Sequence, residues 1–305
     1  MGLWTMWAQA GLAVDPQVNE VVFSLSESHG AIMELVIQFQ VLNQSCLCLA
    51  WSPPSRGCQE QQRVVAGYGN GSLRLFSVFH TALKLKVCPH MAALMAIAFS
   101  TNDEEPGLRI VLSGDEDGLV AVSHPCTGMT FRVLNDYRGA PISTTQNMNL
   151  GVEGTDLWLV ASGDQWVSIW ASNWLRDHCE LVDWLSFPTP APKETWGLPP
   201  SSLAAFCPWD GVLVEVTVYS LCQKQMVEKI SLPFSAISLS LSPGALMAIG
   251  FAGEMLAEVG DCTAGTAQDL AGHDNTVHLC RFTPSARLLF TAAHDEILMW
   301  EVMDL

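Results

Sequence analysis

Positive charge is scarce in this sequence. Its 305 residues include 14 Lys and Arg against 31 Asp and Glu, which gives a formal net charge of −17. A protein that binds a nucleic-acid backbone needs clustered cations, and the Lys and Arg here stand singly along the chain. Binding to an anionic membrane surface needs basic clusters as well. We therefore expect no nucleic-acid partner and no membrane partner.

Paired cysteine motifs are also absent. The 10 Cys residues are mostly single and mostly lie inside apolar runs such as Cys46-Leu47-Cys48. No C-x-x-C occurs, and no Cys and His spacing suits a zinc site. A chain of this length does not need disulfides to stabilise its core. We therefore expect buried free thiols in a reducing compartment, with no metal and no cofactor.

Signals for export or membrane insertion are missing too. The first Lys or Arg is Arg56, so the apolar segment at the N-terminus has none of the basic residues that begin a secretory signal. No apolar run reaches the ~18 residues that span a bilayer. These absences predict a soluble, cytoplasmic protein.

The sequence also lacks the common catalytic motifs. Neither G-x-S-x-G nor H-E-x-x-H occurs. The Gly-rich segment 67–71 joins two apolar strands with no helix after it, so we expect a tight turn and not a phosphate loop. The acidic segment 115–118 starts like a calcium loop but lacks the later ligands, so we expect a hairpin turn. The sequence therefore predicts that the protein is not an enzyme.

Tryptophan, in contrast, is plentiful: the chain has 11 Trp and only 3 Tyr, as expected if one large ring is used repeatedly. Strand-like runs recur that end in an aromatic residue or Leu, then Ser, Thr or Cys, and usually Pro. These anchors are Trp51-Ser52-Pro53, Phe99-Ser100-Thr101, Phe206-Cys207-Pro208, Leu241-Ser242-Pro243 and Phe282-Thr283-Pro284, with a weaker one near Met148. Their spacings of 48, 49, 58, 35 and 41 residues average close to the ~40–45 of a four-stranded propeller blade.

A second signal follows most anchors: an apolar strand, a tight turn of small or acidic residues, and another apolar strand. Segment 109–113, for example, turns at 115–118 into segment 119–122, and segment 158–162 turns at 163–164 into segment 166–170. Two-residue alternation with Gly or Asp at the turn is typical of β-hairpins. Helical periodicity is not sustained anywhere, so we predict an all-β fold.

The segment from Gly272-His273 to Trp300 resembles a WD repeat, and the whole chain is similar to WD-repeat β-propellers. In that family His, Ser or Thr, Asp and Trp form a structural hydrogen-bonded tetrad in each blade. The resemblance implies tetrad positions at His273, Thr291, Asp295 and Trp300 in the last repeat, at Ser162, Asp164 and Trp170 in the third, and at His90 and Asp117 in the second, where Ser123 falls in the Trp position. Such a tetrad supports architecture and implies no chemistry.

The resemblance also implies how the chain is divided. We expect repeats at 41–90, 91–138, 139–186, 201–235, 236–271 and 272–305, with strand 32–41 supplying the last repeat's missing strand and closing the ring. Six four-stranded blades is the predicted count, with seven as the alternative if residues 17–25 contribute. We expect the fourth blade to be incomplete, because segment 211–219 contains no turn residues. Residues 1–30 are expected to be divergent or flexible.

Segments 41–54, 220–234 and 271–302 further resemble the C-terminal propeller of large centriolar and ciliary WD-repeat proteins. The resemblance implies a non-catalytic scaffold at the centriole, centrosome or cilium base, which binds proteins through its rim and loops. Direct tubulin binding is not expected, because an acidic propeller and an acidic filament repel each other. The alternatives are a substrate receptor of a ubiquitin ligase and, with less support, a propeller hydrolase.

Overall fold

A computed structural model describes the backbone of most of the chain. The described residues are 2–6, 18–26, 32–40, 44–52, 63–100, 110–135, 138–149, 155–162, 166–173, 176, 178–186, 203–206, 215–220, 225–242, 246–261, 266–283, 286–294 and 296–302. They form two compact units, one made of the described residues up to Ser186 and the other of those from Leu203 onward. No helix in the described residues is long and apolar enough to cross a membrane.

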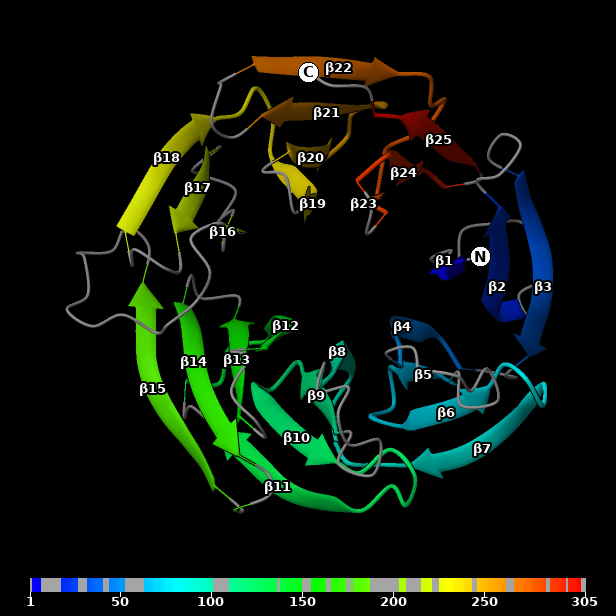
Figure 1. Ribbon diagram of the computed structural model, residues 1–305, viewed down its shortest axis with the longest axis vertical. Helices are drawn as coiled ribbons and strands as arrows, with labels where there is room; N and C mark the ends of the chain where they lie inside the picture. Colours follow the sequence, from blue (N-terminus) through cyan, green and yellow to red (C-terminus); the bar gives the residue numbers. More distant parts are fainter. Residues whose placement is uncertain are drawn as a thin grey trace. The chain divides into compact units, whose positions relative to one another are not determined.

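The first unit contains four antiparallel sheets (Figure 1). The first sheet has β1 (Gly2–Met6), β2 (Val18–Ser26) and β3 (Ile32–Gln40), and the second has β4 (Cys46–Trp51), β5 (Arg63–Tyr68), β6 (Leu73–Ser77) and β7 (Ala82–Val87). The third has β8 (Leu94–Phe99), β9 (Val111–Asp115), β10 (Leu119–Ser123) and β11 (Thr130–Asn135), and the fourth has β12 (Ile142–Asn149), β13 (Thr155–Ser162), β14 (Trp166–Asn173) and β15 (His178–Ser186). In each sheet the strands lie side by side in sequence order.

The second unit contains three further antiparallel sheets. These are β16 (Leu203–Phe206), β17 (Glu215–Ser220) and β18 (Gln225–Ser231); then β19 (Ala236–Leu241), β20 (Leu246–Phe251), β21 (Leu256–Asp261) and β22 (Thr266–Ala271); then β23 (Leu279–Phe282), β24 (Leu288–Ala292) and β25 (Ile297–Glu301). Each of the six predicted repeats thus holds one sheet. The fourth repeat has three strands among the described residues, so a shortened blade stays the interpretation there.

The N-terminal segment differs from the prediction. Strand β3, which we expected beside the last repeat, forms a sheet with β1 and β2: Val22 of β2 pairs with Ile37 of β3 and with Thr5 of β1. Strands that follow one another in the chain commonly pair, and here this local pairing accounts for the residues that we had assigned to the last sheet. The described residues thus form seven sheets, as the alternative with a contribution from residues 17–25 expected, and strand structure is present inside 1–30.

The hydrophobic core lies between consecutive sheets. In the first unit, Val65 and Leu75 of the second sheet pack with Leu94 and Val111 of the third. The third and fourth sheets share a cluster that includes Leu112 and the fully buried ring of Trp158. Strands β9 and β10 are almost wholly buried, whereas β7 and β11, the last strands of their sheets, expose several side chains. Burial therefore falls toward the last strand of each of these two sheets.

Glycines near the ends of second strands let neighbouring sheets approach closely. A Cβ added at Gly114 of β9 would lie 2.7 Å from Ile142 Cβ of β12, and one added at Gly67 of β5 would lie 2.9 Å from Leu94 Cβ of β8. Gly250 of β20 is similar, because a Cβ there would lie 2.9 Å from the Val277 carbonyl oxygen. In these three sheets a small residue near the end of the second strand is thus a packing requirement.

Candidate functional site

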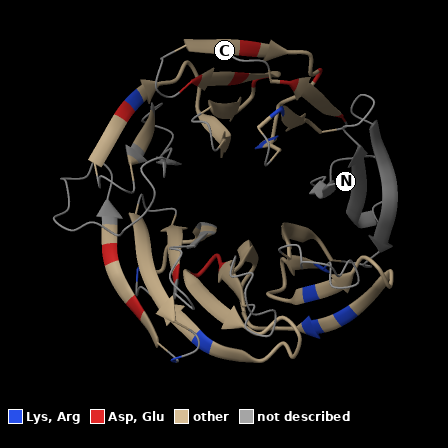
Figure 2. Cartoon of the chain, viewed as in Figure 1, with Lys and Arg blue, Asp and Glu red and all other residues tan. Residues whose placement is uncertain are grey.

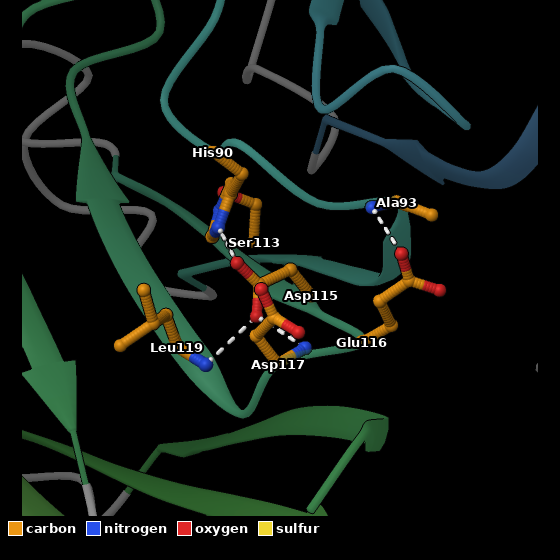
Figure 3. A network of polar contacts seen from close by, with 7 residues as sticks. All are labelled: His90, Ala93, Ser113, Asp115, Glu116, Asp117 and Leu119. Carbon is orange, nitrogen blue, oxygen red and sulfur yellow. Dashed lines mark hydrogen bonds and ion pairs between the residues drawn. The ribbon is translucent and has the colours of Figure 1, made fainter. Parts of the chain in front are cut away.

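The second repeat contains a buried polar network around His90 (Figure 3). His90 precedes β8, and its Nδ1 lies 2.7 Å from Asp115 Oδ2 while its Nε2 lies 2.9 Å from Ser113 Oγ. The other carboxylate oxygen of Asp115 accepts hydrogen bonds from the backbone N–H groups of Asp117 (3.1 Å) and Leu119 (2.8 Å). Asp115 therefore joins the segment before the sheet to the β9–β10 turn.

The last repeat contains an equivalent network around His273. The His273 Nε2 atom lies 2.6 Å from Thr291 Oγ1, and Trp300 Nε1 donates a 2.7 Å hydrogen bond to the same oxygen. The acidic partner is Glu296, whose Oε1 lies 2.9 Å from His273 Nδ1 and accepts a 2.8 Å hydrogen bond from the Asp274 N–H. The structure thus brings together three of the predicted residues, His273, Thr291 and Trp300.

The acidic partner of the histidine differs from the prediction in the second repeat. In the second repeat it is Asp115 and not Asp117, because Asp115 ends β9 and faces the buried histidine, whereas Asp117 is exposed in the turn. In the last repeat Glu296 occupies the position, and the predicted Asp295 lies outside the described residues. A usable signal was in the sequence: Ser113-Gly114-Asp115 matches Ser162-Gly163-Asp164, where the prediction did choose the residue after Gly.

The third repeat uses its predicted residues differently. Ser162 Oγ donates to the Trp166 carbonyl oxygen (3.2 Å), and Trp170 Nε1 donates to Ser168 Oγ (2.9 Å). Asp164 lies outside the described residues. The sequence therefore identified two residues of this hairpin but not their partners.

Strand register explains why Trp170 does not match Trp300. Trp300 pairs with Leu289, two residues before Thr291, whereas Trp170 pairs with Trp158, four residues before Ser162. Relative to the Ser or Thr of its hairpin, Trp170 thus lies two residues further along its strand than Trp300 does. Trp158, which the prediction did not single out, is almost fully buried and donates its Nε1–H to Ser172 Oγ (3.0 Å).

The His90 network has the connectivity of a Ser-His-Asp triad. Its burial argues against that chemistry: Ser113 is 0% exposed, and the side chains of His90 and Asp115 are each 1% exposed. A nucleophile must reach within bonding distance of a substrate, and Ser113 is enclosed between strands. The hydrogen bonds instead satisfy polar groups that would be costly to bury alone. We interpret both networks as structural: the last repeat has a tetrad, and the second repeat has the same arrangement without the Trp.

The cysteine thiols are unsuited to nucleophilic chemistry where they are buried. Burial raises the pKa of the Cys48 and Cys280 thiols to about 12, and it raises the pKa of Cys179 to about 11 although the Arg132 guanidinium partly opposes the shift. The thiolate, which is the reactive form, is then scarce at neutral pH. Cys88 and Cys126 are exposed, so the expectation of buried thiols is wrong for these two. In the described part of the chain, no three His, Cys, Asp or Glu residues are placed to hold a metal ion.

The remaining candidate for function is the outer surface. Met129, Phe131 and Val133 follow one another at two-residue intervals, from just before β11 into the strand, and are 63%, 39% and 54% exposed. Residues at such intervals share one face of a regular strand. A β-bulge at Phe131 interrupts the register with β10, and the exposure of all three side chains shows that they face outward nonetheless. Leu134, which points to the other face, is buried in the core. The last strand of the third sheet thus presents an apolar stripe, which the sequence analysis did not single out.

An aromatic cluster joins the β11–β12 connection to the fourth sheet. The Arg138 guanidinium lies 4.2 Å from the ring centroid of Trp166 and 5.5 Å from that of Trp184, and the two Trp rings meet edge to face at 6.1 Å. Stacking of Arg on Trp is favourable because the guanidinium faces the negative surface of the ring. The arrangement fixes the connection from β11 to β12, and it accounts for two Trp residues that no repeat pattern explained.

Comparison with known proteins identifies the architecture. A family model described as the fourth β-propeller of WDR90 matches residues 17–305. The chain belongs to the WDR90 fourth-propeller family. The match includes β2 and β3, so the family's part of the chain begins before the boundary that we expected at residue 30.

Relatives of this family are similar over most of the chain. WD repeat-containing protein 90 of Homo sapiens is 66% identical and that of Mus musculus 62% identical, each over 94% of this chain. The protein of the same name from Xenopus tropicalis is 47% identical over 89% of this chain. The chain spans only 18%, 17% and 15% of the lengths of these relatives. The WDR90 propeller is therefore one part of much longer proteins in these species.

Solved structures agree on the fold. A chain in the crystal structure of the mitotic checkpoint complex matches with a TM-score of 0.66 at 16% identity. The match covers 100% of this chain and 92% of the other. Sqt1 of Saccharomyces cerevisiae has a TM-score of 0.67 at 14% identity, with 95% of this chain and 80% of Sqt1 covered. The predicted all-β WD-repeat propeller is confirmed, in a family whose members are generally non-catalytic interaction modules.

Proposed function

We propose that this chain is a non-catalytic protein–protein interaction scaffold that acts in centriole and cilium assembly. The observation that carries the proposal is the apolar stripe of Met129, Phe131 and Val133 on β11, because exposed apolar side chains in contiguous positions are typical of docking surfaces. The polar networks, in contrast, are enclosed and serve the blades themselves. Binding through the outer strands and loops follows from this division.

The cellular setting rests on family membership. The resemblance to centriolar and ciliary WD-repeat proteins supports a location at the centriole, centrosome or cilium base. The net charge of −17 disfavours direct contact with an acidic filament surface, so protein partners within the assembly are favoured over tubulin.

Proximity labelling in ciliated cells tests the proposal. The 305-residue chain, fused to a labelling enzyme, is compared with a variant carrying Met129→Glu and Val133→Glu. A matched control carries Thr266→Glu and Gln268→Glu on β22, which is also exposed. We expect centriolar or ciliary proteins to be labelled by the wild type and the control and to be depleted with the β11 variant. Absence of such proteins from the wild-type sample would contradict the proposal, and enrichment of ubiquitin-ligase scaffolds would support the ligase alternative.

A further inference from the structure

Charge is distributed unevenly along this acidic chain. Between Glu60 and Asp103 the sequence contains four Lys and Arg and no Asp or Glu. This segment includes three of the four strands of the second sheet, β5, β6 and β7. The strand that completes the sheet, β4, carries no charged side chain. The second sheet is therefore cationic in a protein whose net charge is −17.

The cations gather at the β6–β7 side of that sheet. Arg74 of β6 is paired directly with Lys86 of β7, and Lys84 lies two residues before Lys86, at a register irregularity. Figure 2 shows the resulting blue bands on β6 and β7. Lys84 and Lys86 are both exposed, and neither has an ion-pair partner in the part of the chain that the structure describes. Like charges directly opposite each other are unfavourable, so a negatively charged partner would relieve repulsion here.

Strand β7 also lies at an edge of its sheet. It is the last strand of the order β4-β5-β6-β7, so in the described structure it is hydrogen-bonded on the β6 side only. Two large apolar side chains are exposed beside the cations, Leu83 at 48% and Phe79 at 56%. An unpaired edge, a pair of lysines and adjacent apolar surface are the elements of a strand-addition site.

Lysine on an edge strand can simply prevent aggregation. Several other terminal strands argue against that explanation for β7, because they carry acidic residues; β11 has one cation and no acid, but that residue, Arg132, donates a hydrogen bond to the Cys179 carbonyl oxygen. Strand β15 carries Glu180 and Asp183, β22 carries Asp269, and β18 carries one acidic and one basic residue. Figure 2 shows red bands on β15 and β22. Two lysines without an acid are particular to β7 among these strands.

We propose that the edge of β7 binds an extended acidic polypeptide segment, which adds to the sheet as a further strand. The inference rests on the proposed scaffold function and names the class of partner. Main-chain hydrogen bonds to β7 supply affinity, and alternate side chains of the segment supply specificity. Its carboxylates lie against Lys84 and Lys86, and its apolar side chains lie against Leu83.

Nucleic acid is the less suitable anion for this surface. Phosphate-backbone recognition draws on many cations along a groove, and the acid-free segment has four Lys and Arg within a chain of net charge −17. An acidic polypeptide needs fewer charge contacts, because its backbone also pairs with the strand edge. Association driven partly by charge should weaken as salt screens the lysines.

Fluorescence polarisation with the 305-residue chain tests the proposal. The probe is a labelled peptide of alternating Glu and Val; the comparison probes alternate Gln and Val, or carry central prolines that remove the backbone N–H groups. The test variant has Lys84→Glu and Lys86→Glu, and the charge-matched control has Arg176→Glu and Lys229→Glu, both exposed positions. We expect the test variant to bind the Glu-Val probe at least about tenfold more weakly and the control to change it by less than about threefold.

The comparison probes make the mechanism falsifiable without any variant. We expect weaker binding of the Gln-Val and proline probes to the wild type, and weaker binding of the Glu-Val probe at high salt. Equal binding of all three probes, equal binding by the test variant, or tighter binding of duplex DNA would overturn the proposal. A thermal melt of the Lys84→Gln, Lys86→Gln variant verifies that folding is retained, and we expect this neutral variant to lose binding as well.

The same variants separate this proposal from the scaffold function. If the wild type labels centriolar proteins in cells and the Lys84→Glu, Lys86→Glu variant labels them equally, the β7 site is wrong and the scaffold function stands. If the wild type labels none, the scaffold function fails whatever the peptide measurements give. Loss of a defined subset of labelled proteins with the variant, together with loss of peptide binding, supports the β7 site.

Discussion

Asp115 binds His90 through one carboxylate oxygen, at 2.7 Å, and the β9–β10 turn through the other. One side chain thereby fixes both the approach to β8 and the hairpin that follows β9. The pair is almost completely buried, so neither residue can exchange its partner for water. This arrangement explains why the acidic residue that matters is the last residue of the strand.

Replacing Asp115 with Asn should therefore destabilise the fold. Asp115 uses both side-chain oxygens and the amide of Asn has only one, so a buried group is left without its partner, which costs about 2 kcal/mol. Asp117→Asn is the matched control, since its side chain is exposed, and should change the free energy of unfolding by less than about 0.5 kcal/mol. Urea denaturation of both variants measures the change in the free energy of unfolding. Equal effects of the two substitutions would mean that the acidic residue has been assigned wrongly.

The close approach of neighbouring sheets predicts a cost for Gly114→Ala. The new methyl group would overlap Ile142, and overpacking of this kind costs roughly 1–3 kcal/mol. Adding Ile142→Ala should recover part of the loss, as a double-mutant cycle would reveal. Gly69→Ala is the control, because the nearest atom to its added Cβ is Leu47 Cδ1 at 3.7 Å. Additive effects at positions 114 and 142 would contradict this packing.

A pair of carboxylates in the fifth repeat predicts a pH effect. Glu258 of β21 is paired with Asp269 of β22, and burial, followed by the charge of Asp269, raises the pKa of Glu258 above its usual 4.5. The folded state then holds this proton more tightly than the unfolded state, so the contribution of Glu258 to stability is full below pH 4.5 and declines as the pH rises through the raised pKa. Relieving the repulsion at neutral pH should stabilise the protein.

Asp269→Asn should accordingly raise the free energy of unfolding at neutral pH by about 0.5 kcal/mol. The gain should shrink as the pH is lowered towards the range in which Glu258 becomes protonated. Glu228→Gln on β18 removes one charge that faces Val218 and not a carboxylate, so it is the control. Denaturant melts at several pH values measure the free energy of unfolding of each variant relative to the wild type. A destabilised Asp269→Asn variant would be incompatible with the repulsion.

Thiol reactivity should follow burial. Cys88 and Cys126 are exposed and should be alkylated by iodoacetamide in the native protein. Cys48 and Cys280, whose pKa burial raises to about 12, should react only after unfolding. Mass spectrometry of peptides from native and denatured samples distinguishes the two groups. Native-state modification of Cys280 at a rate like that of Cys126 would show that its strand is not packed as described.

Much of the fold was predictable because each blade repeats local signals. Anchors such as Phe99-Ser100 and turns such as segment 115–118 marked the sheets, and the His273, Thr291 and Trp300 set followed from one well-matched repeat. The contribution of β2 was expected only as an alternative, because no anchor motif follows Val18–Ser26. Sequence patterns detect a blade where its turn residues are intact.

The details of the polar networks were harder to predict, because they depend on register. Trp170 and Trp300 have similar places in the sequences of their hairpins, yet Trp170 donates to Ser168 of its own strand, β14, whereas Trp300 donates across the hairpin to Thr291 of β24. The basic edge of β7 was missed for a related reason: Arg74 and Lys86 are distant in sequence and become neighbours only when β6 and β7 pair. Contacts between strands are not encoded in local spacing.

Hydrogen–deuterium exchange on the complex of this chain with a partner identified by proximity labelling shows whether the terminal strands of the sheets carry binding while the enclosed polar networks do not. We predict new protection in peptides covering Ala82–Val87 of β7 or Thr130–Asn135 of β11, with unchanged exchange in peptides covering Val111–Asp115 of β9. Protection confined to segments outside these terminal strands would contradict the account.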